Sequence, residues 1–213
     1  IDKDGKKIFD QVDYQNYLDY INEEVRDYSY MKFPFIKFLG PQDGWYRVGP
    51  LARLNTATFI DTDEAFAAHK EFRELQKDRA NNITMCYHWA RMIELLHAIE
   101  KIRELLLDPD LQGKELLSSG PRREEAVAIV EAPRGTLIHH YRVDRNDAVT
   151  MCNLIVSTTN NNEPMNRAIT KVAKDHFSGR REISEKLLNC IEVAIRAYDP
   201  CLSCATHRLG GMP

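Results

Sequence analysis

The sequence predicts a mainly α-helical fold with a small β element, an α+β class. Residues 82–107 and 183–195 repeat apolar side chains at the spacing of a helix face. Between them, β-branched residues concentrate in short runs, which is typical of strands. The 213 residues are enough to bury a substantial core, either as one domain or as part of a larger one.

The first 48 residues are expected to hold three different structures. An Asp-Gly turn signal within 2–12 predicts a hairpin arm. Apolar side chains at helical spacing predict an amphipathic helix over 13–28. Residues 29–48 are rich in aromatics, Pro and Gly without a clear period, so we expect an ordered loop packed on the core.

Two helices are expected next. Asp61 and Glu64 have the spacing of a capping box, which predicts a helix that runs through Leu75. The longest regular segment, 82–107, is apolar over so much of its circumference that we expect it to be central to the core. The inner face of the first helix is predicted to consist of Ala65, Ala68, Phe72 and Leu75.

Three short strands are predicted after a loop at 118–121. They cover 126–130, 136–143 and 149–157, with a turn at 144–147 between the last two. The strands would form the small β element of the fold.

The chain is then expected to close with two helices. The first begins at Pro164 and runs to about Phe177, after which Ser178-Gly179 interrupts it. The second carries the apolar stripe 183–195 and ends at Asp199-Pro200, because the residue before a proline avoids the α region.

Composition excludes several function classes. A net charge of -3 provides no basic field for nucleic acid. No apolar run approaches the ~18 residues of a membrane helix, and no signal-peptide pattern is found at the start. Five cysteines, an odd number, suit a reducing compartment better than a disulfide scaffold. We therefore expect a cytoplasmic protein with no nucleic-acid or membrane partner.

The most informative segment is 199–207, which reads Asp-Pro-Cys-Leu-Ser-Cys-Ala-Thr-His. Cys201 and Cys204 can direct their sulfurs at one ion, and thiolates are soft ligands suited to transition metals. The preceding Asp-Pro makes the start of this loop stiff. His207 adds a further nitrogen ligand or a hydrogen-bond donor to a ligand.

Taken alone, this pair of cysteines leaves alternatives open. It equally fits half of a zinc site or a thioredoxin-like redox pair. Structural zinc needs four ligands, and no second Cys-x-x-Cys is found. The motif also follows a helix, whereas a thioredoxin motif begins one. The other cysteines lie isolated in apolar runs, at positions 86, 152 and 190.

The full string Asp-Pro-Cys-x-x-Cys-x-x-His resembles the closing motif of the large, catalytic subunit of nickel-iron hydrogenases. Residues 131–135 (Glu-Ala-Pro-Arg-Gly) resemble the family's arginine-bearing loop. Residues 48–55 (Val-Gly-Pro-Leu-Ala-Arg-Leu-Asn) resemble a stretch of its soluble, cofactor-coupled branch, which is NAD-reducing-like. Residues 155–162 resemble its hydroxyl-bearing loop. The resemblance implies the helical core of a large subunit, with residues 1–213 as the C-terminal part of that domain.

The resemblance implies a Ni-Fe centre that carries CO and CN ligands. Cys201 would bind nickel terminally, and Cys204 would bridge nickel to iron. Arg134, beside Pro133, would lie over the open coordination site and donate hydrogen bonds to a cyanide. A role for Arg134 as a base conflicts with the proton that arginine retains in proteins, so a terminal thiolate is the easier proton acceptor. Because no second cysteine pair precedes Cys201, the other thiolates are expected in an N-terminal part of the subunit.

The resemblance also implies supporting residues. The hydroxyl that faces the cyanide would belong to Thr158. The family has proline before this hydroxyl and this sequence has Ser157, so Ser157 is a rival. A magnesium ion would bind His207 and the carbonyl of Leu137. Residues 208–213 would begin a C-terminal extension that a maturation endopeptidase removes.

The function implied is reversible heterolytic cleavage of H2, with electrons passed to a small iron-sulfur subunit. Diaphorase-type or other electron-acceptor subunits would carry them to NAD(P) or another soluble acceptor, because no dinucleotide fingerprint is found here. Two alternatives come from other classes: a fold-related, non-catalytic subunit of a respiratory-type electron-transfer complex, and a zinc-binding interaction module.

Overall fold

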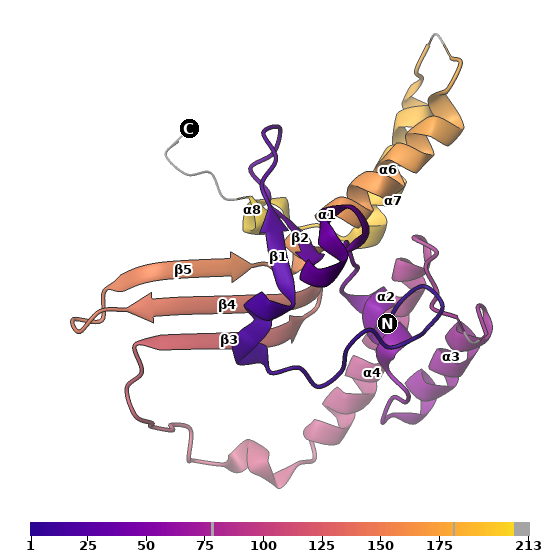
Figure 1. Cartoon of the computed structure of the whole chain (residues 1–213). Helices are drawn as coiled ribbons and strands as arrows, with labels where there is room; N and C mark the ends of the chain where they lie inside the picture. The colour runs from indigo at the N-terminus through magenta and orange to yellow at the C-terminus, as the bar shows by residue number, and fades with distance from the viewer. Residues whose placement is uncertain (78, 181, 207–213) are drawn as a thin grey trace.

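The structure is a computed structural model that describes residues 1–77, 79–180 and 182–206. A helical body, a three-stranded sheet and a projecting pair of helices make up the chain (Figure 1). This arrangement confirms the α+β class. In chain order, the elements are η1 (Tyr14–Asp19), β1 (Ile21–Glu24), β2 (Phe33–Ile36), η2 (Lys37–Leu39), α1 (Gly40–Asp43), α2 (Pro50–Thr56), α3 (Asp63–Glu74), α4 (Cys86–Leu105), η3 (Pro109–Gln112), β3 (Glu125–Ala132), β4 (Gly135–Val143), β5 (Val149–Ile155), α5 (Ser157–Asn160), α6 (Asn162–Phe177), α7 (Glu185–Tyr198) and α8 (Leu202–Ala205).

The main core lies where α2, α3, α4 and the inner ends of α6 and α7 meet. Phe72 of α3 and Tyr87 of α4 are fully buried there. The Phe72 ring meets Trp89 edge-on with centroids 5.4 Å apart, and Tyr87 packs on Tyr198 at 4.9 Å. The cluster therefore fixes the C-terminal end of α7 to the body, just before the cysteine motif.

The long helix α4 is less buried than the sequence predicts. Cys86, Ala90 and Ile93 of α4 are buried, as expected. From Met92 onward most of its large apolar side chains are exposed, although α3 packs against the helix and the α3 N-cap residue Thr62 hydrogen-bonds with His97 at 3.0 Å. The exposed residues are Met92, Leu95, Ile99, Ile102 and Leu105.

The start of α3 differs from the predicted capping box. The N-cap residue is Thr62, without a side-chain cap, and the helix begins at Asp63. The carboxylate of Glu100 on α4 accepts the backbone N–H groups of Glu64 and Ala65 at 3.1 and 3.0 Å. A residue from another helix thus satisfies the free donors, which no local pattern could indicate. Leu75, assigned to the inner face, is exposed.

The N-terminal predictions were wrong in three places. Residues 2–12 form a turn closed by hydrogen bonds between Asp2 and Lys6, without strands. The predicted helix 13–28 is a short 3-10 helix, η1, followed by strand β1. The predicted loop contains β2, which pairs antiparallel with β1 and is buried along its whole length. Pairing with β2 thus outweighs the helical spacing of 13–28.

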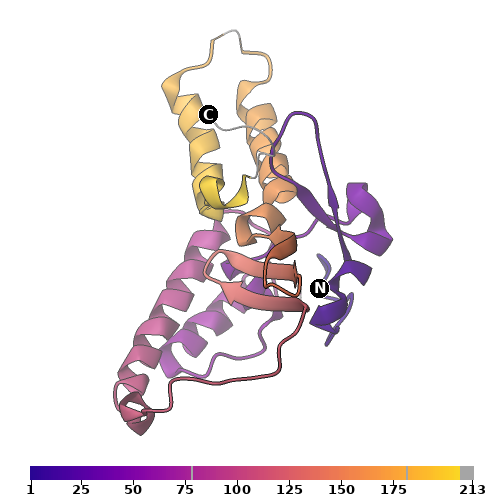
Figure 2. The ribbon, with the colours of Figure 1, turned by 90° about the vertical axis from the view of Figure 1, so that its left-hand side faces the viewer.

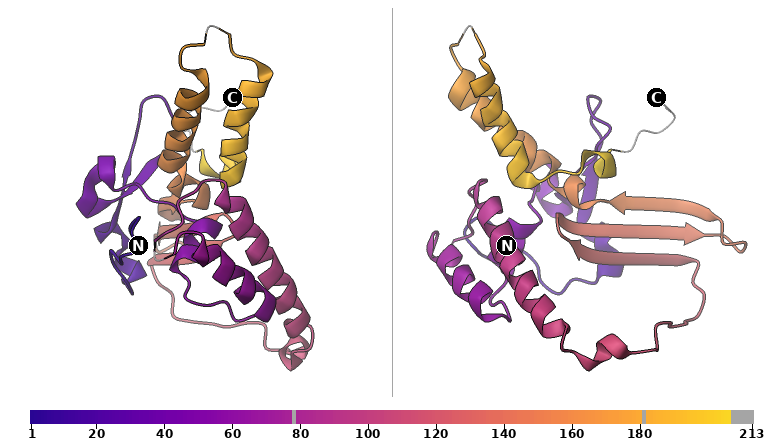
Figure 3. Two further views of the ribbon diagram at one scale, coloured as in Figure 1. Left: turned by 90° about the vertical axis from the view of Figure 1, so that its right-hand side faces the viewer. Right: turned by 180° about the vertical axis from the view of Figure 1, so that it is seen from behind.

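The predicted sheet is confirmed. Strands β3, β4 and β5 pair antiparallel in that order, with Ala132 opposite Gly135 at one hairpin and a turn at 144–147 at the other. Figure 3 shows the sheet extending as an arm from the helical body. The Pro133–Arg134 tip of the first hairpin consequently points back to the body, where it meets the cysteine motif.

Helices α6 and α7 form an antiparallel hairpin that projects from the body (Figure 2). The break at Ser178-Gly179 is confirmed, with Gly179 at φ 76°. On α7 burial is limited to the inner end, at Ala194, Ala197 and Tyr198, while Ile183 before its start is exposed. Among the described residues, no helix has the length and apolarity needed to cross a membrane.

Truncating Phe72 should strongly destabilise the body. Its side chain is fully buried, so Phe72→Ala removes packed surface and leaves a cavity that costs ~3–5 kcal/mol. Chemical denaturation followed by circular dichroism measures the loss. Phe59→Ala, at a side chain 65% exposed, is the matched control and should change stability little. Equal losses in both variants would contradict the assigned core.

Acid should weaken the junction between the β1–β2 loop and α6, where Arg26 pairs with Glu163. Burial alone would raise the pKa of Glu163, but hydrogen bonds from Arg26 and Arg167 outweigh it and hold that pKa below its ordinary value. A carboxylate with a depressed folded-state pKa contributes stability that is present above its unfolded value, ~4.3. This contribution is lost as the pH falls through the folded-state pKa.

The difference in melting temperature between wild type and Glu163→Gln should therefore be largest near neutral pH and shrink below about pH 4. Thermal unfolding across this range measures it. Glu192→Gln, which removes an exposed pair with Arg196, is the control and should have little effect. A difference that stays constant with pH would contradict the assignment.

Candidate metal centre

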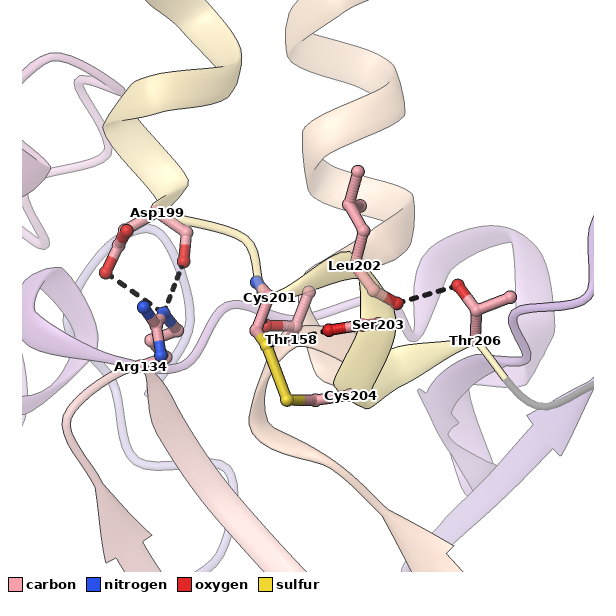
Figure 4. Close-up of a disulfide and its surroundings, with 8 residues drawn as sticks. All are labelled: Arg134, Thr158, Asp199, Cys201, Leu202, Ser203, Cys204 and Thr206. Atoms are coloured by element: carbon pink, nitrogen blue, oxygen red, sulfur yellow. Dashed lines mark hydrogen bonds and ion pairs between the residues drawn. A yellow bond between two sulfur atoms is a disulfide. The ribbon is translucent and has the colours of Figure 1, made fainter.

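Four segments that are distant in sequence converge on the C-terminal cysteine motif: 48–53, 131–136, 157–161 and 199–204. Figure 4 shows the cysteine pair with the neighbouring residues from the last three of these segments. Each segment is held by hydrogen bonds to another, as the following paragraphs describe.

The two cysteines lie immediately beyond α7. Asp199 adopts a left-handed backbone (φ 50°) that ends the helix, and Pro200 prevents it from continuing. Cys201 is then the N-cap of α8, which carries Cys204. Their Cα atoms are 5.4 Å apart, and the sulfurs are joined as a disulfide. Both sulfurs thus reach the same place, and in the reduced state the pair can direct two thiolates at one ion.

Arg134 lies beside this pair. Its Nε donates to the backbone carbonyl of Asp199 at 2.8 Å and pairs with the Asp199 carboxylate at 3.0 Å (Figure 4). Within the described part of the chain, its terminal nitrogens Nη1 and Nη2 make no hydrogen bond. The guanidinium is therefore tied two residues before Cys201, with donors left for a small anionic ligand.

Two hydroxyl groups of the α5 segment join the same site. Thr158 is buried, and its Oγ1 accepts the backbone N–H of Cys201 at 3.0 Å. Ser157 is buried as well, and its Oγ donates to the carbonyl of Gly135 at 2.8 Å. One hydroxyl thus contacts the cysteine loop directly, while the other contacts the residue after Arg134.

Hydrogen bonds to α6 and α4 fix the C-terminal end of α7. The hydroxyl of Tyr198 donates to the Pro164 carbonyl at 3.1 Å, and Arg91 of α4 donates to the Ala197 carbonyl at 3.1 Å. The cysteine loop therefore starts from a rigid base. Cys201 is half-buried and Cys204 is exposed, so the cysteine pair lies at the surface of this chain.

Sequence reasoning missed the buried amides that brace the site. Asn161 accepts the backbone N–H of Val48 at 3.0 Å and donates to the carbonyl of the same residue at 3.3 Å. Asn160 accepts from Tyr46 and donates to the carbonyl of Thr136 at 2.8 Å. Burial raises the pKa of the Tyr46 phenol, so it remains a donor. The signal in the sequence was the run of three asparagines, 160–162. The structure shows that all three are buried, and buried amides usually have hydrogen-bond partners.

Glycines allow the closest approach between two of the segments. A Cβ at Gly49, whose φ is 90°, would lie 2.8 Å from the carbonyl oxygen of Arg134. At Gly135, whose φ is 136°, a Cβ would overlap the side chain of Val48 and lie 3.0 Å from the Gly49 nitrogen. Neither position has room for a side chain, so the arginine tip and the 48–49 turn are packed backbone against backbone.

Gly135→Ala should displace the arginine tip and destabilise the chain by ~1–3 kcal/mol, the range for overpacking. Denaturant unfolding measures the loss. Gly120→Ala is the matched control, because a Cβ there meets nothing within 4 Å. A Gly135→Ala variant as stable as this control would contradict the close packing.

The magnesium prediction is only partly within the described residues. Leu137 lies in β4 opposite Val130, next to the site. His207 and the predicted extension 208–213 lie outside the described residues. Among the described residues, no group of three or more His, Cys, Asp or Glu side chains could hold a metal ion.

The donor set that the structure assembles fits a soft transition metal. Two sulfurs reach one point, a cationic guanidinium with unused donors lies beside them, and a buried hydroxyl contacts their loop. Thiolates select transition metals over magnesium or calcium. The α+β fold with this donor set is the arrangement that a protein with a thiolate-ligated transition-metal centre would need.

The family model described as nickel-dependent hydrogenase matches residues 2–207, so the chain belongs to the nickel-dependent hydrogenase family. This agrees with the family resemblance of the cysteine motif and does not favour the zinc-module alternative.

Relatives agree with this assignment. The beta subunit of the NAD-reducing hydrogenase HoxS of Cupriavidus necator is 51% identical over 213 residues, covering 99% of this chain and 44% of that protein. One subunit of the F420-non-reducing hydrogenase of Methanothermobacter marburgensis is 46% identical over 210 residues, covering 98% of this chain and 44% of that protein.

A solved structure agrees as well. The crystal structure of an NAD+-reducing NiFe hydrogenase in the H2-reduced state superposes with a TM-score of 0.89 at 52% identity, covering 94% of this chain and 44% of that one. This chain thus spans about half the length of the relatives it matches, and the large-subunit fold expected from the sequence is confirmed over that span.

Proposed function

We propose that this chain is the C-terminal part of the catalytic subunit of a nickel-iron hydrogenase, which catalyses the reversible heterolytic cleavage of H2. The observation that carries the proposal is the convergence of Cys201 and Cys204 with Arg134, joined to them through Asp199. Membership of the nickel-dependent hydrogenase family supports it.

In this proposal Cys201 and Cys204 would hold the Ni-Fe centre through their thiolates, Cys201 as a ligand of nickel and Cys204 as a ligand of nickel and iron. When bound, that centre with its CO and CN ligands supplies the redox chemistry that separates H2 into protons and electrons. Two thiolates do not complete a four-coordinate site. We place the remaining ligands in the part of the subunit that the relatives have and this chain does not span.

The other residues of the site would act on charge and position. Arg134 retains its proton, so its role is to donate hydrogen bonds to an anionic ligand rather than to accept a proton. The Thr158 hydroxyl, or its rival Ser157, would hold a second anionic ligand, while Pro133 lines the site beside Arg134. Leu137 and His207 would hold magnesium, and maturation would end the chain at His207.

Electrons would leave through a small iron-sulfur subunit. The name of the HoxS relative supports NAD+ as the final acceptor, reached through diaphorase-type subunits in the cytoplasm. The F420-non-reducing relatives, at up to 46% identity, carry a name that excludes F420 and states no acceptor, so identity to relatives does not by itself support one acceptor. Measuring H2-dependent reduction of NAD+ and NADP+ against that of an artificial dye by the purified complex separates these cases.

Metal analysis of the full-length subunit, purified with its partners, tests the proposal. We expect one nickel per subunit, iron in excess of nickel because the partner subunit holds iron-sulfur clusters, and infrared bands from CO and CN. Zinc in this subunit without nickel would support the interaction-module alternative, and the absence of both nickel and zinc would support the non-catalytic subunit. Either of these two results would overturn the proposed function.

A further inference from the structure

The side chain of Arg53, in α2, makes a set of contacts that no element of the proposed function uses. Its Nε and Nη2 donate to the two carboxylate oxygens of Glu94 at 2.6 and 2.8 Å. Its Nη1 donates to a carboxylate oxygen of Glu131 at 2.8 Å and to the carbonyl of Ala132 at 2.9 Å. Nη2 also donates to the carbonyl of Pro133 at 2.9 Å. Five contacts match the five N–H donors of a guanidinium.

Two of these contacts fall on the two residues that precede Arg134, Ala132 and Pro133. Ala132 ends β3 and pairs with Gly135, so Pro133 and Arg134 form the tip of the hairpin. Proline donates no backbone hydrogen bond, so the position of the tip depends on contacts from other segments. Arg53 provides one such link between the tip and the helical body.

Helix α4 provides the other end of the tie. Glu94, whose carboxylate accepts hydrogen bonds from Nε and Nη2 of Arg53, lies one turn after Arg91 on the same helix. Arg91 donates to the carbonyl of Ala197, two residues before Asp199. The segments that carry Arg134 and Asp199 are thus both linked to neighbouring turns of α4, the first through Arg53 and Glu94 and the second through Arg91.

The charges of Arg53, Glu94 and Glu131 make the Arg53 contacts hard to replace with another residue. Burial lowers the pKa of Arg53, but hydrogen bonds with Glu94 and Glu131 outweigh it and raise the pKa, so the group stays cationic. Without the guanidinium, two carboxylates would face each other near the tip. Lysine would restore the charge but not the planar fork, because an ammonium has three donors around one point.

We infer that Arg53 is a positioning residue, which holds the Pro133–Arg134 tip at the distance from Cys201 and Cys204 that the reaction requires. This inference rests on the proposed function. It adds to the site a residue that lies in a different helix from any of the predicted ligands.

The test compares Arg53→Lys with wild type in the full-length enzyme complex. We expect nickel and iron content to be retained, KM for H2 to change little, and kcat to fall ~10- to 100-fold, the loss typical of residues that orient ligands or reacting groups. The infrared CN bands should shift, because Arg134 changes its distance to the ligand. Arg53→Gln should lower kcat further.

Arg73→Lys is the matched control. Arg73 is also half-buried, and it donates to a backbone carbonyl of α2, that of Asn55 at 2.6 Å, rather than to a residue of 131–136. It should leave kcat and the CN bands unchanged. Unchanged kcat and CN bands in Arg53→Lys, or a kcat loss that merely follows loss of metal, would overturn the inference and leave the proposed function standing.

Hydrogen exchange supplies a readout that does not depend on the metal. Amides of residues 131–136 should exchange faster in Arg53→Lys than in wild type, whereas amides of 149–155 in β5 should not. Equal protection of 131–136 in both proteins would overturn the positioning role. If the wild-type enzyme lacked nickel, the proposed function would fail, and this exchange result would still decide whether Arg53 holds the tip.

Discussion

Cys201→Ser should abolish nickel retention and H2 oxidation together. A serine hydroxyl is a hard ligand that stays protonated at neutral pH, whereas the proposed centre requires soft thiolates. Even partners that only orient a ligand cost ~10- to 100-fold in metal affinity or activity, so losing a ligand should cost more. Nickel per subunit, measured by elemental analysis, and H2-dependent dye reduction report the two losses.

Cys204→Ser should give the same result, because both sulfurs reach one place in the structure. Cys152→Ser is the matched control: this cysteine is free and exposed in β5, so metal content and activity should remain at the wild-type level. Retention of stoichiometric nickel in either motif variant would remove the basis of the proposed centre.

Arg134→Lys should leave the metal in place and lower turnover. Lysine keeps the positive charge but loses the Nε contact with Asp199 and the two terminal nitrogens that point to no partner among the described residues. Removing one preorganised donor to developing charge typically costs ~100- to 1000-fold in rate. Turnover per bound nickel, rather than per mole of protein, is the quantity to compare.

Arg145→Lys provides the control for this change, since Arg145 is an exposed arginine in the other turn that β4 contributes to, at 144–147. It should have wild-type turnover. If Arg134→Lys instead lost its nickel, the residue would serve assembly of the centre; if it turned over normally, its proposed hydrogen bond to an anionic ligand would be wrong.

Local patterns predicted the regular elements where one periodicity dominated. The strands around 126–157 and the helices around 164–177 and 82–107 were placed within a few residues of their observed bounds. The predictions from local patterns were wrong where long-range contacts outweighed local preference. The segment 13–28 has helical spacing, yet Ile21–Glu24 pairs with the buried strand Phe33–Ile36, because each strand completes the backbone hydrogen bonds of the other.

The candidate site shows the same division. The cysteine motif and the Pro-Arg-Gly tip could be recognised from short strings, and the structure brings them together. The contacts that connect them could not be predicted from the sequence. These contacts are Arg134 with Asp199, the Cys201 amide with Thr158, and the Arg53 guanidinium with Glu131, and each joins residues more than 40 positions apart. Sequence spacing carries no information about such pairs.

The sequence by itself determined the chemistry that this chain can offer, two thiolates and an arginine in the order its family uses, since residue type alone decides what a side chain can ligate or donate. Only the tertiary structure decided that a hairpin tip, a helix end and two backbone turns meet at one point. The physical reason is that their meeting depends on buried side chain-to-backbone hydrogen bonds, which form only after the helices and the sheet have packed.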